Sequence, residues 1–92
     1  MADDLPISVD AAVRVLQGMI PEDEQAKIAK MPEDELPMLH FGLGQWIRNN
    51  LGLWQGNTQL LAATGEKHPD DASEVIIRAF WQRLRDDLPK LH

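Results

Sequence analysis

The chain has 92 residues, of which 43% are hydrophobic and 26% are charged, and it contains no cysteine. A chain of this length has surface for one core only, and without cysteine it lacks disulfides, thiolate metal ligands and cysteine nucleophiles. Its formal net charge of −6 disfavours binding to nucleic acid, which requires a clustered positive field. We therefore expect one acidic domain over residues 1–92, with flexible flanks at residues 1–7 and 89–92.

The sequence also bears on location. No segment approaches the roughly 18 consecutive apolar residues that span a bilayer. The first residues, Met1–Asp4, lack the basic start and the apolar run of a signal peptide. We therefore expect a cytoplasmic protein that makes no membrane contact.

The first predicted helix begins after Ser8, whose hydroxyl can accept a hydrogen bond from the free amides of the first turn. Its apolar residues recur every three or four positions, as on one face of a helix, and they are Val9, Ala12, Val13, Leu16, Met19 and Ile20. Pro21 ends this helix because it lacks an amide proton.

Two identical tetrapeptides follow, Pro21–Glu24 and Pro32–Glu35, eleven positions apart. Each predicts a helix start, with proline in the first turn and carboxylates near the positive end of the helix dipole. The first opens a short, weak helix that ends near Met31.

The second tetrapeptide leads into a central helix that we expect to be mostly regular from Leu36 to Leu51 and to stop at Gly52. Pro37 either lies in its first turn or divides a short leading turn from it. On a helical wheel its core face carries Leu36, Leu39, Leu43, Trp46, Ile47 and Leu51. The same wheel places Phe41, Gln45, Arg48 and Asn49 on the opposite side, and His40 and Asn50 within the core face.

Two further helices complete the chain. Asn57 is a good N-cap for a helix over residues 58–64, which Gly65 closes. The last helix is predicted from Pro69 to about Asp87, and its apolar residues cover about two-thirds of its circumference, as in a helix that is central or shared with a partner. We expect an all-α fold, a compact orthogonal bundle of about five helices.

The run from His40 to Trp54, HFGLGQWIRNNLGLW, resembles the core motif of a family of small bacterial domains of unknown function. The run His68–Asp71 and the pair Phe80–Trp81 match its downstream elements, so that the resemblance extends from about Val9 to Leu84. It implies one intact domain and specifies no activity, substrate or cofactor.

Three residues of the central helix, His40, Gly44 and Arg48, are spaced four apart and so follow one edge of it. Glycine costs about 1 kcal/mol relative to alanine inside a helix, so Gly44 calls for an explanation. Either a neighbouring helix packs closely at Gly44, or a ligand approaches there between His40 and Arg48.

Other features favour structural roles. His40 has no ligand-type neighbour at helical spacing, and the sequence contains no metal or cofactor motif. The segment Arg48–Asn50 is typical of helix capping, and the partners we expect for Arg48 are the chain's own acids at Glu33–Glu35 or Asp70–Asp71. We therefore predict no cofactor, no metal and no catalytic residue.

The function predicted first is a protein-interaction or accessory module that binds another protein or a second copy of itself. Its surface would be the side of Phe41, Gly44, Arg48 and Asn49, or the apolar arc of the last helix around Trp81. The alternative is a small-ligand binder or enzyme that uses His40 and Arg48, with Asn49 or Asn50 orienting the substrate.

A third hypothesis is nucleic-acid binding through the C-terminal basic cluster of Arg78, Arg83, Arg85 and Lys90. Asp86 and Asp87 dilute this cluster, and the acidic composition makes it the least favoured of the three.

Overall fold

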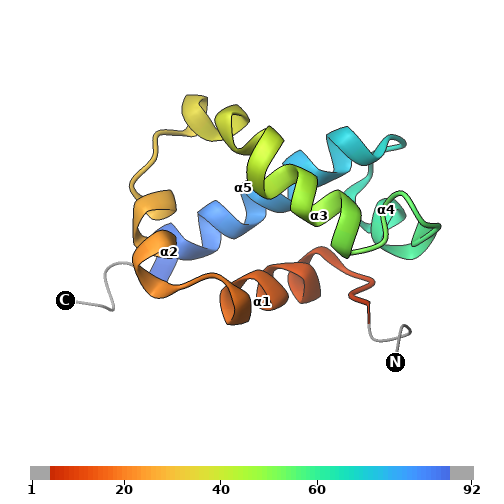
Figure 1. Ribbon diagram of the computed structural model, residues 1–92, viewed down its shortest axis with the longest axis horizontal. Helices are drawn as coiled ribbons and strands as arrows, with labels where there is room; N and C mark the ends of the chain where they lie inside the picture. Colours follow the sequence, from red (N-terminus) through yellow and green to blue (C-terminus); the bar gives the residue numbers. More distant parts are fainter. Residues whose placement is uncertain (1–4, 88–92) are drawn as a thin grey trace.

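The computed structural model describes residues 5–87. Within them the chain forms five α-helices and no strand, and the predicted all-α bundle is confirmed. Figure 1 shows how the helices are arranged. The α-helices are α1 (Val9–Met19), α2 (Glu22–Ala29), α3 (Gln45–Asn50), α4 (Thr58–Thr64) and α5 (Pro69–Asp87). Between α2 and α3 lie a 3₁₀ segment, η2 (Glu33–Leu39), and a π-helical segment, η3 (His40–Gly44).

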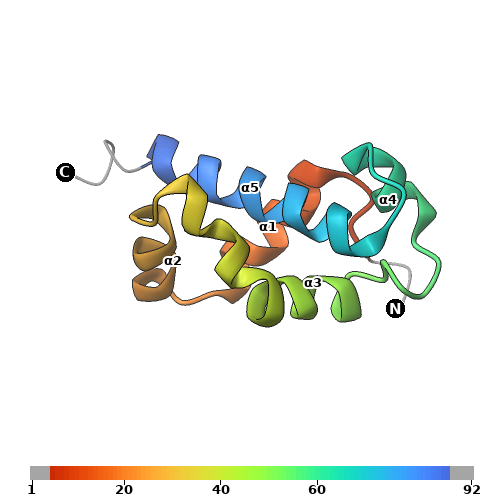
Figure 2. The same cartoon turned by 90° about the horizontal axis from the view of Figure 1, so that it is seen from above.

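Helix α5 is the central element. It runs from α4 at one end of the molecule to α2 at the other, and it packs against all the remaining helical elements (Figures 1 and 2). Its buried residues are Ala72, Ser73, Ile76, Ile77, Phe80, Trp81 and Leu84. The broad apolar arc is therefore covered by the chain itself, and the expectation that it forms a docking face is not supported.

The predicted helix ends agree with the structure where local chemistry decides them. The Ser8 hydroxyl accepts a hydrogen bond from the Ala11 amide at 3.1 Å, and Asn57 caps α4 through the Leu60 amide at 3.3 Å. Gly65 ends α4 with φ of 79°, a conformation that glycine adopts at little steric cost.

The N-terminal flank, predicted to be flexible over residues 1–7, is described by the structure from residue 5 onward. Pro6 is buried, and its carbonyl accepts a hydrogen bond from Asn57 Nδ2 at 2.9 Å. The rest of that flank, residues 1–4, and the C-terminal flank at residues 89–92 lie outside the described residues. Within the described part, no helix has the length and apolarity needed to cross a bilayer.

The central segment is wound in three ways, and the predicted regular helix is wrong for residues 36–44. Pro37 lies inside η2 and has no amide to donate to the carbonyl four residues back, which disfavours α-helix there. Gly42 and Gly44 flank Leu43 in η3, where their low helix propensity lowers the cost of leaving α geometry. The two glycines thus coincide with the π-turn.

The core side of α3 is also rotated relative to the predicted wheel. Arg48, predicted to face away from the core, is only 7% exposed, whereas Asn50, predicted to face inward, is exposed and donates to the Trp46 carbonyl at 2.9 Å. A helical wheel defines the core face by apolar side chains, so it does not register glycine as a packing surface. Gly44 lets α5 approach, and the Gly44–Arg48 side therefore faces α5.

Candidate functional site

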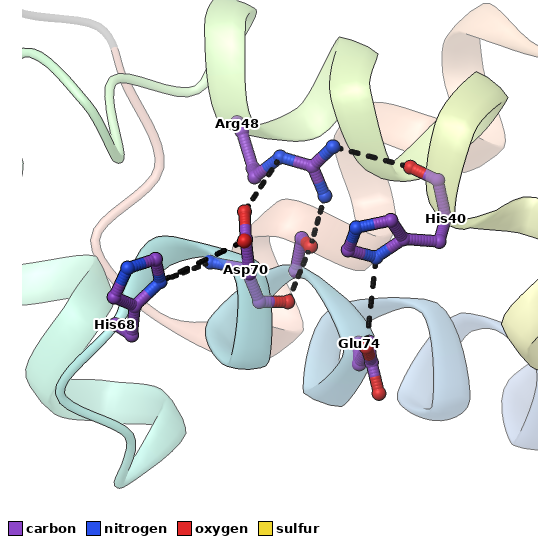
Figure 3. A network of polar contacts seen from close by, with 6 residues as sticks. His40, Arg48, His68, Asp70 and Glu74 are labelled. Atoms are coloured by element: carbon purple, nitrogen blue, oxygen red, sulfur yellow. Dashed lines mark hydrogen bonds and ion pairs between the residues drawn. The ribbon is translucent and has the colours of Figure 1, made fainter.

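A polar network joins the central segment to the start of α5, and Arg48 is its hub (Figure 3). The guanidinium donates from Nη1 to Ser73 Oγ at 2.9 Å and from Nη2 to the His40 carbonyl at 3.2 Å. Its Nε lies 3.4 Å from Asp70 Oδ1. All three nitrogens of the buried Arg48 guanidinium thus contact groups of the chain itself.

The α5 side of the network is ordered by its own backbone contacts. Ser73 Oγ donates to the Asp70 carbonyl at 2.8 Å, and the Asp70 amide donates to His68 Nδ1 at 3.2 Å. The expectation that Arg48 pairs with an internal acid is confirmed for Asp70. Because the Asp70 side chain is 44% exposed, water screens part of this ion pair.

Gly44 has a packing role. A Cβ built at this position would lie 3.0 Å from Arg48 Nη1 and 3.5 Å from Ile77 Cδ1. The space beside the glycine is therefore filled by the Arg48 guanidinium and by α5. This favours the close-packing interpretation of Gly44 over the approach of a ligand.

His40 lies between α5 and the outer surface. Its side chain is 23% exposed, and its buried Nδ1 makes no hydrogen bond within the described residues. The nearest carboxylate, Glu74 Oε2, is 3.5 Å from that nitrogen. The imidazole also meets the Phe41 ring edge to face, with 5.1 Å between the ring centroids. His40 thus links Phe41 to α5.

The outer side of the same segment is apolar and open. Phe41 is 82% exposed and Met38 is 74% exposed, the two highest values among the large exposed hydrophobic side chains of the described residues. Pro37 and Gly42 beside them are exposed as well. We call Pro37, Met38, Phe41 and Gly42 the Met38–Phe41 surface.

Carboxylates lie near this surface. The exposed run Glu33–Glu35 precedes it in η2, and Glu74 borders it across His40. Beyond Glu74 lies an open hollow of about 270 Å³, which is lined by Glu66, Asp71, Glu74, Val75 and Arg78. Glu33 is paired with Arg78, so the acidic rim of the apolar surface consists of Asp34, Glu35 and Glu74.

The basic cluster predicted for nucleic acid is largely neutralised. Arg78 is hydrogen-bonded to Glu33, and Arg83 to Asp10. The Arg85 guanidinium lies over the Trp81 ring at 4.9 Å, and Lys90 is outside the described residues. The ion pairs with Glu33 and Asp10 remove positive field that a phosphate backbone would need.

The fold brings His40, Gly44 and Arg48 together, and the predicted site residues differ in exposure. Gly44, Arg48 and Trp81 are buried, His40 is half-buried, and Phe41 and Asn49 are exposed. No group of three or more His, Cys, Asp or Glu side chains suited to a metal ion occurs within residues 5–87.

Sequence reasoning missed one exposed residue, Met38, which lies three positions before Phe41. Met38 is the penultimate residue of η2 and Phe41 is the second residue of η3, so both belong to the irregular segment before α3. Pro37 was the available signal, because it breaks the regular helix at this point.

Comparison with known proteins places the chain in a family. No curated protein and no solved structure matches it. A family model described as a domain of unknown function (DUF6794) matches residues 5–84, which include all five α-helices except the last residues of α5. The chain therefore belongs to this family of domains of unknown function.

Proposed function

We propose that this protein is a docking module that binds a basic partner protein through the Met38–Phe41 surface. The observation that carries the proposal is the 82% exposure of Phe41 in a small domain that buries its other phenylalanine, Phe80, completely. An exposed aromatic side chain forgoes about 1.5–3 kcal/mol of burial free energy, which a partner's pocket can recover. Aromatic residues are enriched in the energetic centres of protein interfaces.

The site is built to hold Phe41 outward. The residue before it, His40, is fixed by its carbonyl to Arg48, and the His40 ring supports the Phe41 ring. A ring placed on such a support loses little conformational freedom on binding. This supports a role for Phe41 as a preorganised anchor.

The charge of the surface favours a basic partner over a second copy of the chain. Two copies that met through this surface would bring their Asp34, Glu35 and Glu74 carboxylates together. Like charges across an interface oppose association, whereas a partner with lysines and arginines would be steered toward the same rim. The formal charge of −6 acts in the same direction.

The sequence context is compatible with this function. Phe41 and Arg48 both fall in the run at residues 40–54 by which the chain resembles small bacterial domains. The lack of cysteine fits a reducing compartment such as the bacterial cytoplasm. We propose that the partner is met there.

The proposal is tested first by photo-crosslinking in cells of the source organism. A benzophenone amino acid replaces Phe41 in one variant and Trp54 in the other, since Trp54 is also an exposed aromatic residue, at 51%. Residue 41 should crosslink a basic protein that residue 54 does not capture. A crosslink between two copies of the chain at residue 41 would contradict the choice of partner.

The captured protein is then purified and its dissociation constant is measured by calorimetry. Phe41→Ala should raise Kd about tenfold or more, and Met38→Ala about threefold, because both remove buried anchor area. Trp54→Ala and Met19→Ala serve as matched controls and should change Kd less than about twofold. Equal effects of Phe41→Ala and Trp54→Ala would refute the proposal.

A further inference from the structure

We propose that Arg48 is the positioning residue of the Met38–Phe41 surface: its guanidinium holds η3 in its π-helical winding and so keeps Phe41 turned outward. This inference rests on the proposed function for its biological meaning. Its geometric content does not depend on any partner.

The first step is the contact between Arg48 and η3. Arg48 Nη2 donates to the carbonyl of His40, which is the first residue of η3 and lies eight positions before Arg48. The carbonyl oxygen has two lone pairs, so it can accept this bond in addition to a bond from the helix backbone. Arg48 therefore ties the start of the π-turn directly to α3.

The second step is the anchorage of the guanidinium itself. Ser73 Oγ and Asp70 Oδ1, both on α5, hold its other nitrogens at 2.9 and 3.4 Å. The 7% exposure of Arg48 means that water cannot replace a lost acceptor at low cost. The start of η3 is thus fixed to α5, the central helix, through one side chain.

The third step is the mutual fit of Arg48 and the π-turn. Nη1 lies where a side chain at residue 44 would project, 3.0 Å from the ideal Cβ position. Rewinding η3 to α geometry would change the register of His40 relative to Arg48 and leave a buried guanidinium nitrogen without its acceptor. A charged hydrogen bond lost in this way opposes the rewinding.

The last step connects the clamp to Phe41. Phe41 directly follows His40, so the backbone that Arg48 holds also sets the direction of the Phe41 side chain. The edge-to-face contact of the two rings, with an interplanar angle of 88°, depends on the same backbone. Loss of the clamp should therefore disturb η3 and Phe41 before it disturbs the core.

The test is residue-resolved amide hydrogen exchange by NMR on Arg48→Met and Arg48→Lys. Methionine keeps the apolar stem, and lysine keeps the charge without the planar fork that reaches three acceptors. Protection of the amides at residues 41–45 should fall about tenfold more than protection in α1, as the loss of one charged hydrogen bond implies. The ring-to-ring NOE between His40 and Phe41 should weaken in both variants.

Arg14→Met is the matched control. Arg14 is exposed, and its ion pair with Asp10 lies within α1, so its loss should leave exchange in η3 unchanged. If Arg48→Met does not fold, Arg48→Lys carries the test. Unchanged exchange in η3, or an equal fall throughout the chain, would overturn the positioning role and leave Arg48 as a general stabilising residue.

Partner binding separates this inference from the proposed function. If both hold, Arg48→Lys raises Kd for the captured partner about tenfold while the chain stays folded. If the local exchange changes as expected but Phe41→Ala leaves Kd unchanged, the clamp stands and the docking proposal fails. If Phe41→Ala weakens binding while exchange in η3 is the same in all variants, the docking proposal stands and the clamp fails.

Discussion

The two identical tetrapeptides, Pro21–Glu24 and Pro32–Glu35, start two different helices. Their prolines have nearly the same conformation, with φ and ψ of −58° and 151° at Pro21 and of −69° and 153° at Pro32. The first then opens the α-helix α2 and the second opens the 3₁₀ segment η2. The start signal thus fixes where a helix begins and leaves its winding open.

The winding is decided two residues after each tetrapeptide. Ala26 has this position after the first and Pro37 after the second. Alanine supplies the amide that α geometry requires, whereas proline has none. The difference reaches the surface, because η2 is followed by the π-turn that presents Phe41, while α2 ends at Ala29 without an exposed aromatic residue.

The strongest way to break the comparison is to give α2 the proline of η2. Ala26→Pro should lower the free energy of unfolding by about 3 kcal/mol, because it removes an interior amide and clashes with the preceding turn. Urea denaturation measures this loss. Ala26→Gly is the control and should lower it by only about 1 kcal/mol. A loss below about 1 kcal/mol for proline would show that α2 tolerates 3₁₀ winding.

A second comparison uses the residues that directly follow the tetrapeptides, Gln25 and Leu36. Leu36 is 4% exposed, so Leu36→Ala should lower the free energy of unfolding by about 2–3 kcal/mol. Gln25 Nε2 donates to the Gln17 and Ile20 carbonyls at 2.9 and 2.6 Å. Gln25→Ala should lower the free energy of unfolding by about 1 kcal/mol. The reverse order in chemical denaturation would contradict a main role for the buried Leu36 side chain in holding η2.

The converse exchange, Pro37→Ala, should change the winding more than the stability. The restored amide permits α-helix over residues 33–39, while the chain loses the rigidity of proline, and the net change in unfolding free energy should stay within about 1 kcal/mol. NOEs between the α-proton of residue i and the amide proton of residue i+4 should appear in this segment, because a 3₁₀ helix does not give them. Their absence would show that Pro37 is not the cause of the 3₁₀ winding.

The smallest expected effect concerns the matching glutamates, Glu22 and Glu33. Glu33 is paired with Arg78, and both side chains are more than half exposed. Glu33→Gln should lower the free energy of unfolding by about 0.5 kcal/mol, and Glu22→Gln by less. The difference should vanish near 1 M salt, where the Debye length is about 3 Å. A difference that persists at high salt would contradict a screened surface pair.

Local signals explain how much of the fold could be predicted. Ser8, Asn57 and Gly65 act on backbone groups within a few residues of themselves, so the ends of α1 and α4 follow from sequence alone. Asn57 also bonds the Pro6 and Leu51 carbonyls, and this second role depends on chain segments that only the fold brings together. Non-local bonds of this kind have no sequence pattern.

The candidate site could be predicted only in part, because it too depends on contacts between distant chain segments. The place of Phe41 opposite the leucines on the wheel leaves two alternatives, packing under another helix or exposure, and the structure shows exposure. The burial of Arg48 does not follow from the wheel, because it requires Ser73 and Asp70 of α5 to lie beside it. An arginine near a helix end is ordinarily solvated, and only the approach of α5 at Gly44 reverses this.

The central claim is that one irregular segment turns Phe41 toward solvent and Arg48 toward α5. NMR of the unmodified protein with a soluble paramagnetic chelate measures both sides at once. We predict strong broadening of the Phe41 ring signals, together with a sharp Arg48 Hε signal that exchanges slowly with water. A shielded Phe41 ring combined with a rapidly exchanging Arg48 Hε would contradict the account.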